Sequence, residues 1–367
     1  MKHKIAFVLP SLRGGGAERV MLNIIRGLNE KGYDIDLVLV KAVGQFLNNV
    51  PPRVRIIDLN SKRALTSLFA LTNYLNTQKP AIVFPSLPHI SVVTLLARLL
   101  SRSRPIVIPI EHNTLSRSVL HAENLRGRLL PYFMRLAYAR ADRIVAVSLG
   151  VSKDLIETLT IDSSTVSVIY NPVITQKVIT SSFETSDHPW FNGSEYPVVL
   201  GAGRLTQAKG FNVLVNAFAL LRKTRPARLI LIGEGPEKSN LKQLVERHKL
   251  EVDVSMPGFV SNPYVYFRQS SVFVLSSLWE GLPTVLIEAL ACGTRIISTD
   301  CPSGPKEILE NGRWGVLVPV NDIVSLAEQM SNLLEQPKPQ TNSRAWRKFT
   351  IDYSTKAYET LIKEVLE

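Results

Sequence analysis

The stretch Val272–Thr299 constrains the fold of this chain most, because it alternates strand-like and helix-like patterns within a short span. Val272–Ser277 and Thr294–Thr299 are apolar runs with the length and composition of buried strands. Between them, Leu278–Pro283 contains glycine and proline breakers, and Thr284–Cys292 has apolar residues at helical spacing, followed by a glycine. The stretch predicts a βαβ unit whose loop lies at a strand's carboxyl end and faces a helix N-terminus, a place suited to an anion.

Two carboxylates belong to this unit. Glu280 lies in the loop, and Glu288 lies little more than one turn into the helix. We expect both to face the crevice at the strand end, where a buried carboxylate needs hydrogen-bond donors such as sugar hydroxyls. The alternative for Glu288 is a glutamate favoured near a helix N-terminus by the helix dipole, which would explain Glu288 alone.

A second group of charged residues follows the apolar run Val198–Leu200. Arg204 and Lys209 lie five residues apart across a predicted strand–loop–helix junction, and the helix begins near Phe211. A guanidinium and an ammonium that converge there suit a diphosphate. The alternative, a solvated surface cation, would hold for either residue alone.

Glycines mark a similar junction near residue 15. Gly14, Gly15 and Gly16 separate the strand-like run Ile5–Pro10 from a helical pattern that begins near Val20. Three glycines let a ligand approach the backbone and leave amides free for an anion, with a plain tight turn as an even alternative. The spacing is not the G-x-G-x-x-G pattern of dinucleotide-binding proteins.

His112 follows the predicted strand Ile106–Ile110, between Glu111 and Asn113. A single histidine is more often structural than catalytic. Here, however, it lies between polar residues at the carboxyl end of a parallel-type strand, on the edge where such sheets bind ligands. We therefore favour a functional role for His112.

Together these segments resemble the retaining glycosyltransferases of family 4. The spacing of Glu280 and Glu288 resembles the E-x7-E signature of that family, and the string from Arg204 to Lys209 resembles its diphosphate clamp. The resemblance covers nearly the whole chain. It implies an α/β protein with the GT-B fold, in which two doubly wound Rossmann-like domains face each other across a cleft.

The resemblance also implies a reaction. A hexose or N-acetylhexosamine would move from a nucleotide sugar, expected to be a UDP-sugar, to a lipid-linked or polysaccharide acceptor of the bacterial cell envelope. The reaction would retain the anomeric configuration and need no metal or other cofactor. Four residues are expected to be catalytic: Glu280 on the sugar hydroxyls, His112 near the sugar, and Arg204 and Lys209 on the diphosphate. The further expected donor contacts are Glu288 on the ribose, Gly15, Gly16, Glu234, Phe259, Gly281, Leu282, Pro283 and Thr284.

The length of 367 residues predicts two domains, because one domain usually contains about 100–200 residues. Residues 1–173 are the expected N-terminal, acceptor-binding domain, and residues 197–342 the expected C-terminal, donor-binding domain. Residues 174–196 lose all periodicity and are rich in Ser, Thr and Pro, which predicts a linker. A helix over 343–367 is expected to pack back on the N-terminal domain through Trp346, Phe349, Tyr353, Tyr358 and Leu361.

The net charge of +12 belongs to the N-terminal half, because residues 1–180 contain 23 Lys and Arg against 11 Asp and Glu, whereas the rest contains 20 of each. In this half, arginines alternate with large aliphatic and aromatic residues at Arg126, Arg128, Arg135 and Arg140. The pattern favours an anionic membrane surface, with the protein resting on the inner face of the cytoplasmic membrane. A nucleic-acid patch is the alternative, and we expect no nucleic acid because the other motifs have no such role.

Other features of the chain argue against further classes of protein, such as metal-dependent sugar transferases, disulfide-rich proteins and proteins that span a membrane. Asp34 and Asp36 match the D-x-D pattern of metal-dependent sugar transferases, but they open a predicted strand, so we expect no metal there. Two cysteines provide no disulfide framework and fit a reducing cytosol. The N-terminus resembles a signal peptide, but its apolar part covers only about six residues, which favours a first strand. No run of about eighteen apolar residues predicts a membrane span.

Three alternatives to a transferase stay open. A nucleotide-sugar 2-epimerase of the same fold would act on the donor alone, and the Glu280/Glu288 string argues against it. A catalytically inactive nucleotide-sugar-binding protein would keep the site without transfer. A dinucleotide-dependent oxidoreductase fits least, because its glycine fingerprint is missing at both strand–helix turns.

Overall fold

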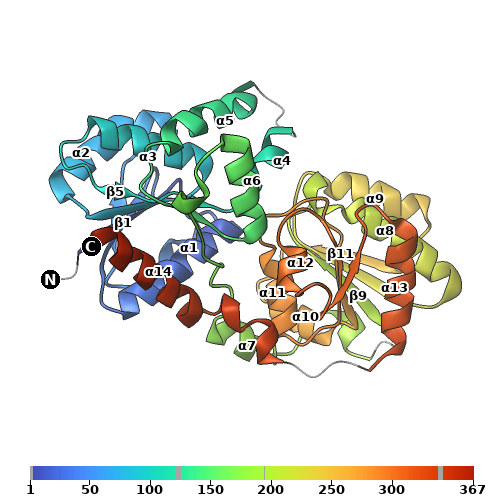
Figure 1. Ribbon diagram of the computed structural model, residues 1–367. Coiled ribbons are helices and arrows are strands. Elements are labelled where there is room, and N and C mark those ends of the chain that lie inside the picture. The colour runs from blue at the N-terminus through green and yellow to red at the C-terminus, as the bar shows by residue number, and fades with distance from the viewer. Residues whose placement is uncertain (1–2, 121–124, 194, 338–341) are drawn as a thin grey trace. The chain divides into compact units, whose positions relative to one another are not determined.

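The computed structural model describes residues 3–120, 125–193, 195–337 and 342–367, without the side chains of residues 125 and 126. Contacts within the chain divide it into two compact units (Figure 1). Unit 1 contains residues 1–173 and 349–367, and unit 2 contains residues 174–348.

Unit 1 is built on a parallel sheet whose central strands are continuous apolar runs, as expected for strands that are covered on both faces. The order across this sheet is β3 (Arg55–Asp58), β2 (Asp34–Leu39), β1 (Lys4–Leu9), β4 (Ile82–Pro85) and β5 (Ile106–Val107). A second parallel group contains β6 (Ile110–Glu111), β7 (Ile144–Ala146) and β8 (Val166–Val168). A parallel bridge between Ser86 and Ile110 joins the two groups.

Helices cover both faces of the unit 1 sheet. α1 (Gly16–Glu30) and α14 (Ile351–Leu366) pack together on one face, and α2 (Leu68–Gln78) and α3 (Pro88–Leu100) pack together on the other (Figure 1). The remaining helices are α4 (Leu115–Leu120), α5 (Leu125–Tyr138) and α6 (Leu149–Leu159). In the core, the ring of Phe84 stacks on Phe7 and meets the edge of Tyr358 from α14.

The segment over 343–367 differs in part from the sequence prediction. Residues 343–348 form short 3-10 turns within unit 2, and only residues from Phe349 onward belong to unit 1. Phe349, Tyr358 and Leu361 are buried, whereas Tyr353 is half exposed. Tyr353 faces outward because it lies five residues before Tyr358, and a spacing of five turns a side chain away from the buried stripe of a helix.

Unit 2 contains a single parallel sheet among its described residues, again with buried, apolar central strands. Its order is β11 (Val254–Gly258), β10 (Arg228–Ile232), β9 (Val198–Ala202), β12 (Val272–Leu275), β13 (Ile296–Thr299) and β14 (Val316–Val318). The helices that follow β9 in the chain are α8 (Phe211–Thr224), α9 (Lys238–Arg247), α10 (Pro263–Gln269), α11 (Thr284–Ala291), α12 (Pro305–Ile308) and α13 (Ile323–Glu335). α13 packs on α8 and α10 packs on α11, and Figure 1 shows these pairs on opposite sides of the strands.

Residues 174–196, predicted to be a linker, belong to the compact unit 2. Thr175 caps the helix α7 (Gln176–Ser181) by accepting a hydrogen bond from the Val178 amide. His188 is buried, and its ring contacts Trp190, Phe191 and Tyr266. The segment packs through scattered aromatic residues rather than a regular period, and a periodicity search therefore does not detect it.

In the main sheet of each unit, the order in which successive strands are added reverses once, at a switch point. The candidate residues lie beside these switch points. The strand order turns between β1 and β4 in unit 1 and between β9 and β12 in unit 2. Ligands of doubly wound sheets bind beside the carboxyl ends of the two strands at such a switch point. Over the ranges that the structure describes, no helix is long and apolar enough to cross a bilayer.

Candidate active site

The switch point of unit 2 brings together the charged residues predicted from two distant segments. The loop after β9 carries Arg204 and Lys209, and the loop after β12 carries Glu280. The Lys209 ammonium donates a hydrogen bond to Oε1 of Glu280 at 2.5 Å. The side chains of Lys209 and Glu280 are 21% and 10% exposed, so the ion pair is largely shielded from solvent.

Backbone and side-chain contacts hold the two loops together. Gly210 has φ +58°, and a Cβ there would lie 2.2 Å from the carbonyl oxygen of Ser276, so the loops approach as closely as a glycine permits. The Ser276 hydroxyl donates to the Lys209 carbonyl at 2.9 Å, and the Leu278 amide donates to the Ala208 carbonyl at 2.8 Å. These contacts fix the backbone beneath the Lys209–Glu280 pair.

Arg204 is exposed beside this pair, and its guanidinium forms no ion pair or hydrogen bond with the part of the chain that the structure describes. Its backbone is held between neighbouring loops, because Gly203 donates to Ile232 and Leu205 donates to Glu234. The exposed cation therefore projects from a fixed position at the edge of the sheet, which suits recognition of an anionic group.

Two of the expected donor contacts, Glu234 and Phe259, lie on the loops after β10 and β11. Glu234 pairs with Lys238 at 2.7 Å, and Phe259 is 67% exposed directly after β11. An exposed aromatic ring on a ligand-binding edge can stack on a planar base. The two residues therefore border the carboxyl ends of β10 and β11, while Lys209 and Glu280 lie at the switch point itself.

The loop that precedes α11 is buried on the same edge. Gly281, Leu282 and Pro283 are buried, and the Ser303 hydroxyl donates to the Gly281 carbonyl at 2.7 Å. Thr284 is the first residue of α11, and Glu288 in the second turn is 4% exposed. Burial raises the pKa of the Cys292 thiol to about 12, with a further contribution from the nearby charge of Glu288.

The glycine loop of unit 1 differs from the prediction that its amides are free for an anion. The amides of Gly14 and Gly15 donate to the Glu18 carboxylate at 2.6 and 3.1 Å. Glu18 is four and three residues further along and belongs to the first turn of α1, so it can cap its own helix. A phosphate bound at these two amides would first have to displace Glu18.

His112 lies at the carboxyl end of β6, next to the switch point of unit 1. Its Nε2 atom is 3.0 Å from the Ser86 hydroxyl, and its Nδ1 atom is buried without a hydrogen-bond partner among the described residues. Burial lowers the pKa of His112 to about 4, so the ring is neutral at pH 7. A buried ring nitrogen without a partner is costly unless a ligand completes it.

Beneath His112, the preceding residue Glu111 is fully buried. Tyr138 of α5 and Ser91 of α3 donate hydrogen bonds to its carboxylate. Burial raises the pKa of Glu111 to about 7, and the two hydrogen bonds oppose this shift. The network ties β6, α3 and α5 together next to the histidine.

Asp34 and Asp36 have structural partners in unit 1. Asp36 is 1% exposed at the start of β2 and accepts hydrogen bonds from Arg55, at 2.6 and 2.9 Å, and from the Tyr74 hydroxyl at 2.7 Å. Asp34 is an exposed partner of Lys4 at 3.8 Å. Within the described ranges, no group of three His, Cys, Asp or Glu side chains is arranged to hold a metal ion.

Two residues at the switch points were not identified from the sequence. Ser277 donates a hydrogen bond to Oε1 of Glu280 at 2.6 Å, and Ser86 contacts His112. Ser277 is the last residue of the predicted strand Val272–Ser277, and Ser86 directly follows β4. Their position at a strand's carboxyl end was the available signal.

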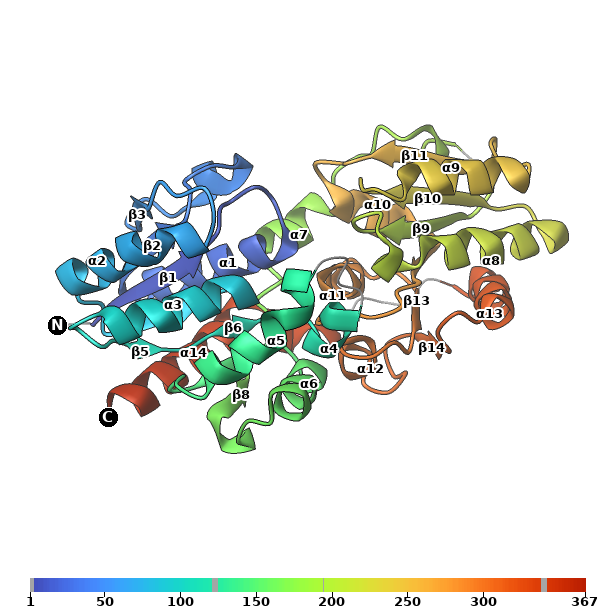
Figure 2. The ribbon, with the colours of Figure 1, turned by 90° about the horizontal axis from the view of Figure 1, so that it is seen from above.

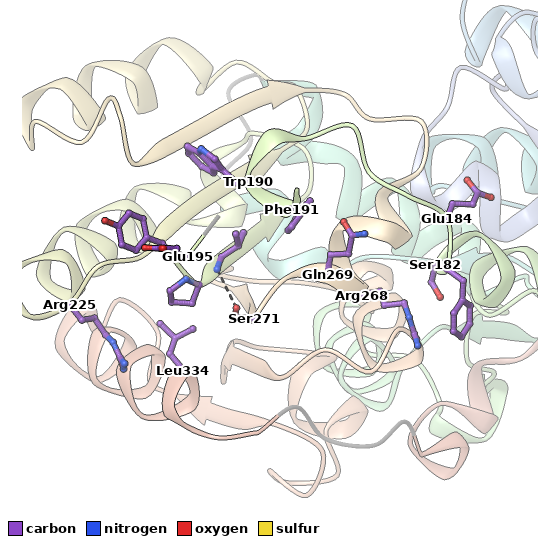
Figure 3. A pocket seen from close by; sticks show the side chains of 14 residues that line it. Ser182, Glu184, Trp190, Phe191, Glu195, Arg225, Arg268, Gln269, Ser271 and Leu334 are labelled. Carbon is purple, nitrogen blue, oxygen red and sulfur yellow. Dashed lines mark hydrogen bonds between the residues drawn. The ribbon is translucent and has the colours of Figure 1, made fainter. Parts of the chain in front are cut away.

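A large hollow in unit 2 lies on the opposite edge of the sheet. It has a volume of about 780 Å³ and is bordered by Val198 and Ser271, at the amino ends of β9 and β12 (Figure 3). Arg225 and Arg268 line it, but Arg225 already contacts Ser331 and Glu335. It is therefore separate from the loops that carry Lys209 and Glu280.

Known proteins that are similar to this chain identify its family. Residues 14–177 match the family described as "Glycosyltransferase Family 4", and residues 182–348 match "Glycosyl transferases group 1". The chain is 26% identical over 354 residues, 91% of each chain, to the N-acetylgalactosamine-N,N'-diacetylbacillosaminyl-diphospho-undecaprenol 4-alpha-N-acetylgalactosaminyltransferase of Campylobacter jejuni. It is also 26% identical over 339 residues, 91% of each chain, to the amylovoran biosynthesis glycosyltransferase AmsD of Erwinia amylovora.

Solved structures share the fold. The Anabaena protein Alr3699/HepE in complex with UDP-glucose superposes with a TM-score of 0.80 at 18% identity, covering 98% of this chain and 100% of that one. WaaG, a glycosyltransferase involved in lipopolysaccharide biosynthesis, superposes with a TM-score of 0.72 at 14% identity over 97% and 95% of the chains. The architecture is therefore GT-B, with two Rossmann-like domains. The chain belongs to the GT-B glycosyltransferases of the bacterial cell-surface family, with a family 4 domain followed by a group 1 domain.

Proposed function

We propose that this glycosyltransferase moves a hexose or N-acetylhexosamine from a UDP-sugar to a lipid-linked or polysaccharide acceptor, with retention and without a metal ion. The observation that carries the proposal is the shielded Lys209–Glu280 pair, beside the exposed Arg204, at the switch point of unit 2. Support for the donor comes from HepE, whose complexes contain UDP and UDP-glucose. Support for the acceptor comes from the diphospho-undecaprenol named in the Campylobacter relative.

In this proposal the diphosphate leaves against fixed positive charge. Arg204 binds it from the exposed side, and Lys209 shares its ammonium hydrogens between Glu280 and a phosphate oxygen. Both cations stabilise the negative charge that develops on the departing diphosphate, which is the role that a metal ion has in other transferases. The leaving phosphate receives the acceptor proton as the acceptor attacks the same face of the sugar.

Sugar recognition in this proposal depends on Glu280 and His112. The Glu280 carboxylate accepts hydrogen bonds from sugar hydroxyls, and Glu288 accepts them from the ribose. His112 is neutral at pH 7, so its Nδ1 atom can complete its hydrogen bonding with an uncharged hydroxyl. The structure of unit 1 supports this role through the orientation that Ser86 gives the ring.

The donor site is tested by thermal shift with UDP, GDP and ADP, each with and without EDTA. Stabilisation by UDP that is lost in Arg204→Ala and unaffected by EDTA supports the proposal. Arg247→Ala is the matched control, because it removes the same charge from an exposed position at the end of α9. Absence of a shift with every nucleotide contradicts the proposal. Where UDP does stabilise the protein, incorporation assays with labelled UDP-sugars distinguish transfer from epimerisation or mere binding.

Unit 1 presents a surface suited to a membrane-bound acceptor. α3 and α5 lie side by side (Figure 2) and expose large apolar side chains together with arginines. The exposed apolar residues on these two helices are Leu96, Leu99, Leu100, Leu129, Tyr132, Phe133 and Leu136. Arg128 and Arg135 are exposed on α5, and the Arg126 side chain lies outside the described residues. Apolar residues flanked by arginines favour the surface of an anionic bilayer.

The membrane proposal is tested by sedimentation with liposomes that contain phosphatidylglycerol, at low and high salt. Arg128→Ser/Arg135→Ser is expected to weaken binding roughly thirtyfold, since each basic residue near such a surface contributes about 1 kcal/mol. Lys356→Ser/Lys363→Ser removes the same charge from α14, on the other face of the unit 1 sheet, and is the control. Equal binding by both double variants contradicts the proposed surface.

A further inference from the structure

Two consecutive serines after β12 contact the two partners of the Lys209–Glu280 pair. Ser276 donates its hydroxyl hydrogen to the backbone carbonyl of Lys209 at 2.9 Å, and Ser277 donates to Oε1 of Glu280 at 2.6 Å. Both serines are buried, with 2% and 0% exposure. Neighbouring residues of an extended segment point to opposite sides, so one serine reaches each loop.

The position of Ser277 is itself fixed by the neighbouring strand. Thr299, the last residue of β13, donates its hydroxyl hydrogen to the Ser277 carbonyl at 2.6 Å. A charged carboxylate can only accept hydrogen bonds, so the Ser277 hydroxyl must be the donor to Glu280. Oε1 of Glu280 thus receives two donors from different loops, Ser277 and Lys209.

We propose that Ser277 is a positioning residue that sets the selectivity for the sugar part of the donor by holding the Glu280 carboxylate. The inference rests on the proposed function, in which Glu280 binds sugar hydroxyls and the diphosphate is bound by Arg204 and Lys209. Without the Ser277 hydroxyl, Oε1 keeps the Lys209 ammonium as a donor, and the carboxylate can rotate toward it. The sugar then loses a fixed acceptor, whereas the cations that bind the nucleotide stay in place.

This separation gives the proposal a specific signature. Ser277→Ala should weaken binding of UDP-glucose or UDP-N-acetylgalactosamine, while binding of UDP itself changes less than about twofold. We expect the ratio of the Kd for the preferred UDP-sugar to the Kd for UDP to rise roughly tenfold, as is typical when one hydrogen bond to a charged group is lost. A purely structural role would weaken UDP and UDP-sugar equally.

The experiment is isothermal titration of the full chain with UDP, UDP-glucose and UDP-N-acetylgalactosamine, preceded by a thermal melt of each variant. Ser270→Ala is the matched control: Ser270 is also fully buried in unit 2, and its hydroxyl donates to the Tyr266 carbonyl at 2.6 Å, before β12 rather than after it. Should Ser277→Ala fail to fold, Thr299→Val tests the same chain of contacts, because it removes the bond that fixes Ser277 and keeps the serine hydroxyl. Thr299→Val is expected to raise the ratio in the same direction.

The outcomes separate this inference from the proposed function. A wild-type protein that binds none of the three probes refutes the proposed function and the inference with it. A wild-type protein that binds them, and a Ser277→Ala variant with an unchanged Kd ratio, refute the inference alone. Equal weakening of UDP and UDP-sugar also overturns it, and a raised ratio in Ser270→Ala overturns the assignment to the Glu280 contact.

Discussion

Replacement of Gly210 by alanine tests whether the close approach of two loops builds the donor site. Alanine at φ +58° costs roughly 1–2 kcal/mol, and its Cβ would lie 2.2 Å from the Ser276 carbonyl oxygen. Because that oxygen belongs to the backbone, the loops must separate. The separation breaks the bonds from Ser276 to Lys209 and from Leu278 to Ala208, each worth about 1 kcal/mol.

The sum is a loss of roughly 3–4 kcal/mol, which corresponds to a fall in Tm of roughly 6–16 °C for a unit of this size. Thermal unfolding by circular dichroism measures the fall, and titration with UDP measures the accompanying loss of affinity. Gly312→Ala is the control within unit 2, because Gly312 has φ +95° but its Cβ would meet nothing nearer than 3.7 Å. A Gly210→Ala protein that melts like Gly312→Ala and binds UDP like the wild type would refute the reasoning.

Three further predictions concern buried ionisable side chains in unit 1. Burial raises the pKa of Glu111 from 4.5 to about 7, so the folded state binds more protons in this window and loses up to about 3 kcal/mol of stability as the pH rises. Glu111→Gln should therefore abolish this loss between pH 5 and 8 in thermal unfolding. Burial lowers the pKa of His112 from 6.5 to about 4, so the folded state binds fewer protons and stability falls as the pH drops through this window. His112→Asn should flatten that fall in urea unfolding at pH 4.5 and 7. Asp36→Asn weakens the hydrogen-bond acceptor of Arg55 and Tyr74 and should lower the free energy of unfolding by about 3 kcal/mol, measured by urea unfolding. Tyr74→Phe should lower it by about 1 kcal/mol. Equal losses in the two variants would contradict the ion-pair reasoning.

The sequence patterns predicted the central βαβ unit well. The strand expected over Val272–Ser277 is β12 (Val272–Leu275), and the helix expected over Thr284–Cys292 is α11 (Thr284–Ala291). These elements were predictable because their signals are local: continuous apolar runs, helical spacing and a glycine after the helix. The GT-B architecture predicted from the family resemblance is confirmed by the solved structures.

Contacts between distant segments could not be predicted in the same way. Lys209 and Glu280 are 71 residues apart, and no local pattern shows that their side chains meet. The prediction that the amides of the glycine loop are free for an anion was wrong for a related reason. Glycines at 14–16 indicate free amides only if no nearby carboxylate accepts their hydrogen bonds. Glu18 was visible in the sequence, but its reach to the amides of Gly14 and Gly15 depends on how α1 begins. The roles assigned to the site residues stay predictions.

The division of unit 1 into two stretches affects how the protein is made. Residues 174–348 are contiguous, so a nascent chain can complete unit 2 without waiting for any later segment. α14 is translated after unit 2, so Tyr358 of α14 can pack against Phe84 of unit 1 only after unit 2 has left the ribosome. The segment translated first therefore keeps apolar surface of α1 and β4 uncovered the longest, and this surface is where a chaperone would bind the growing chain.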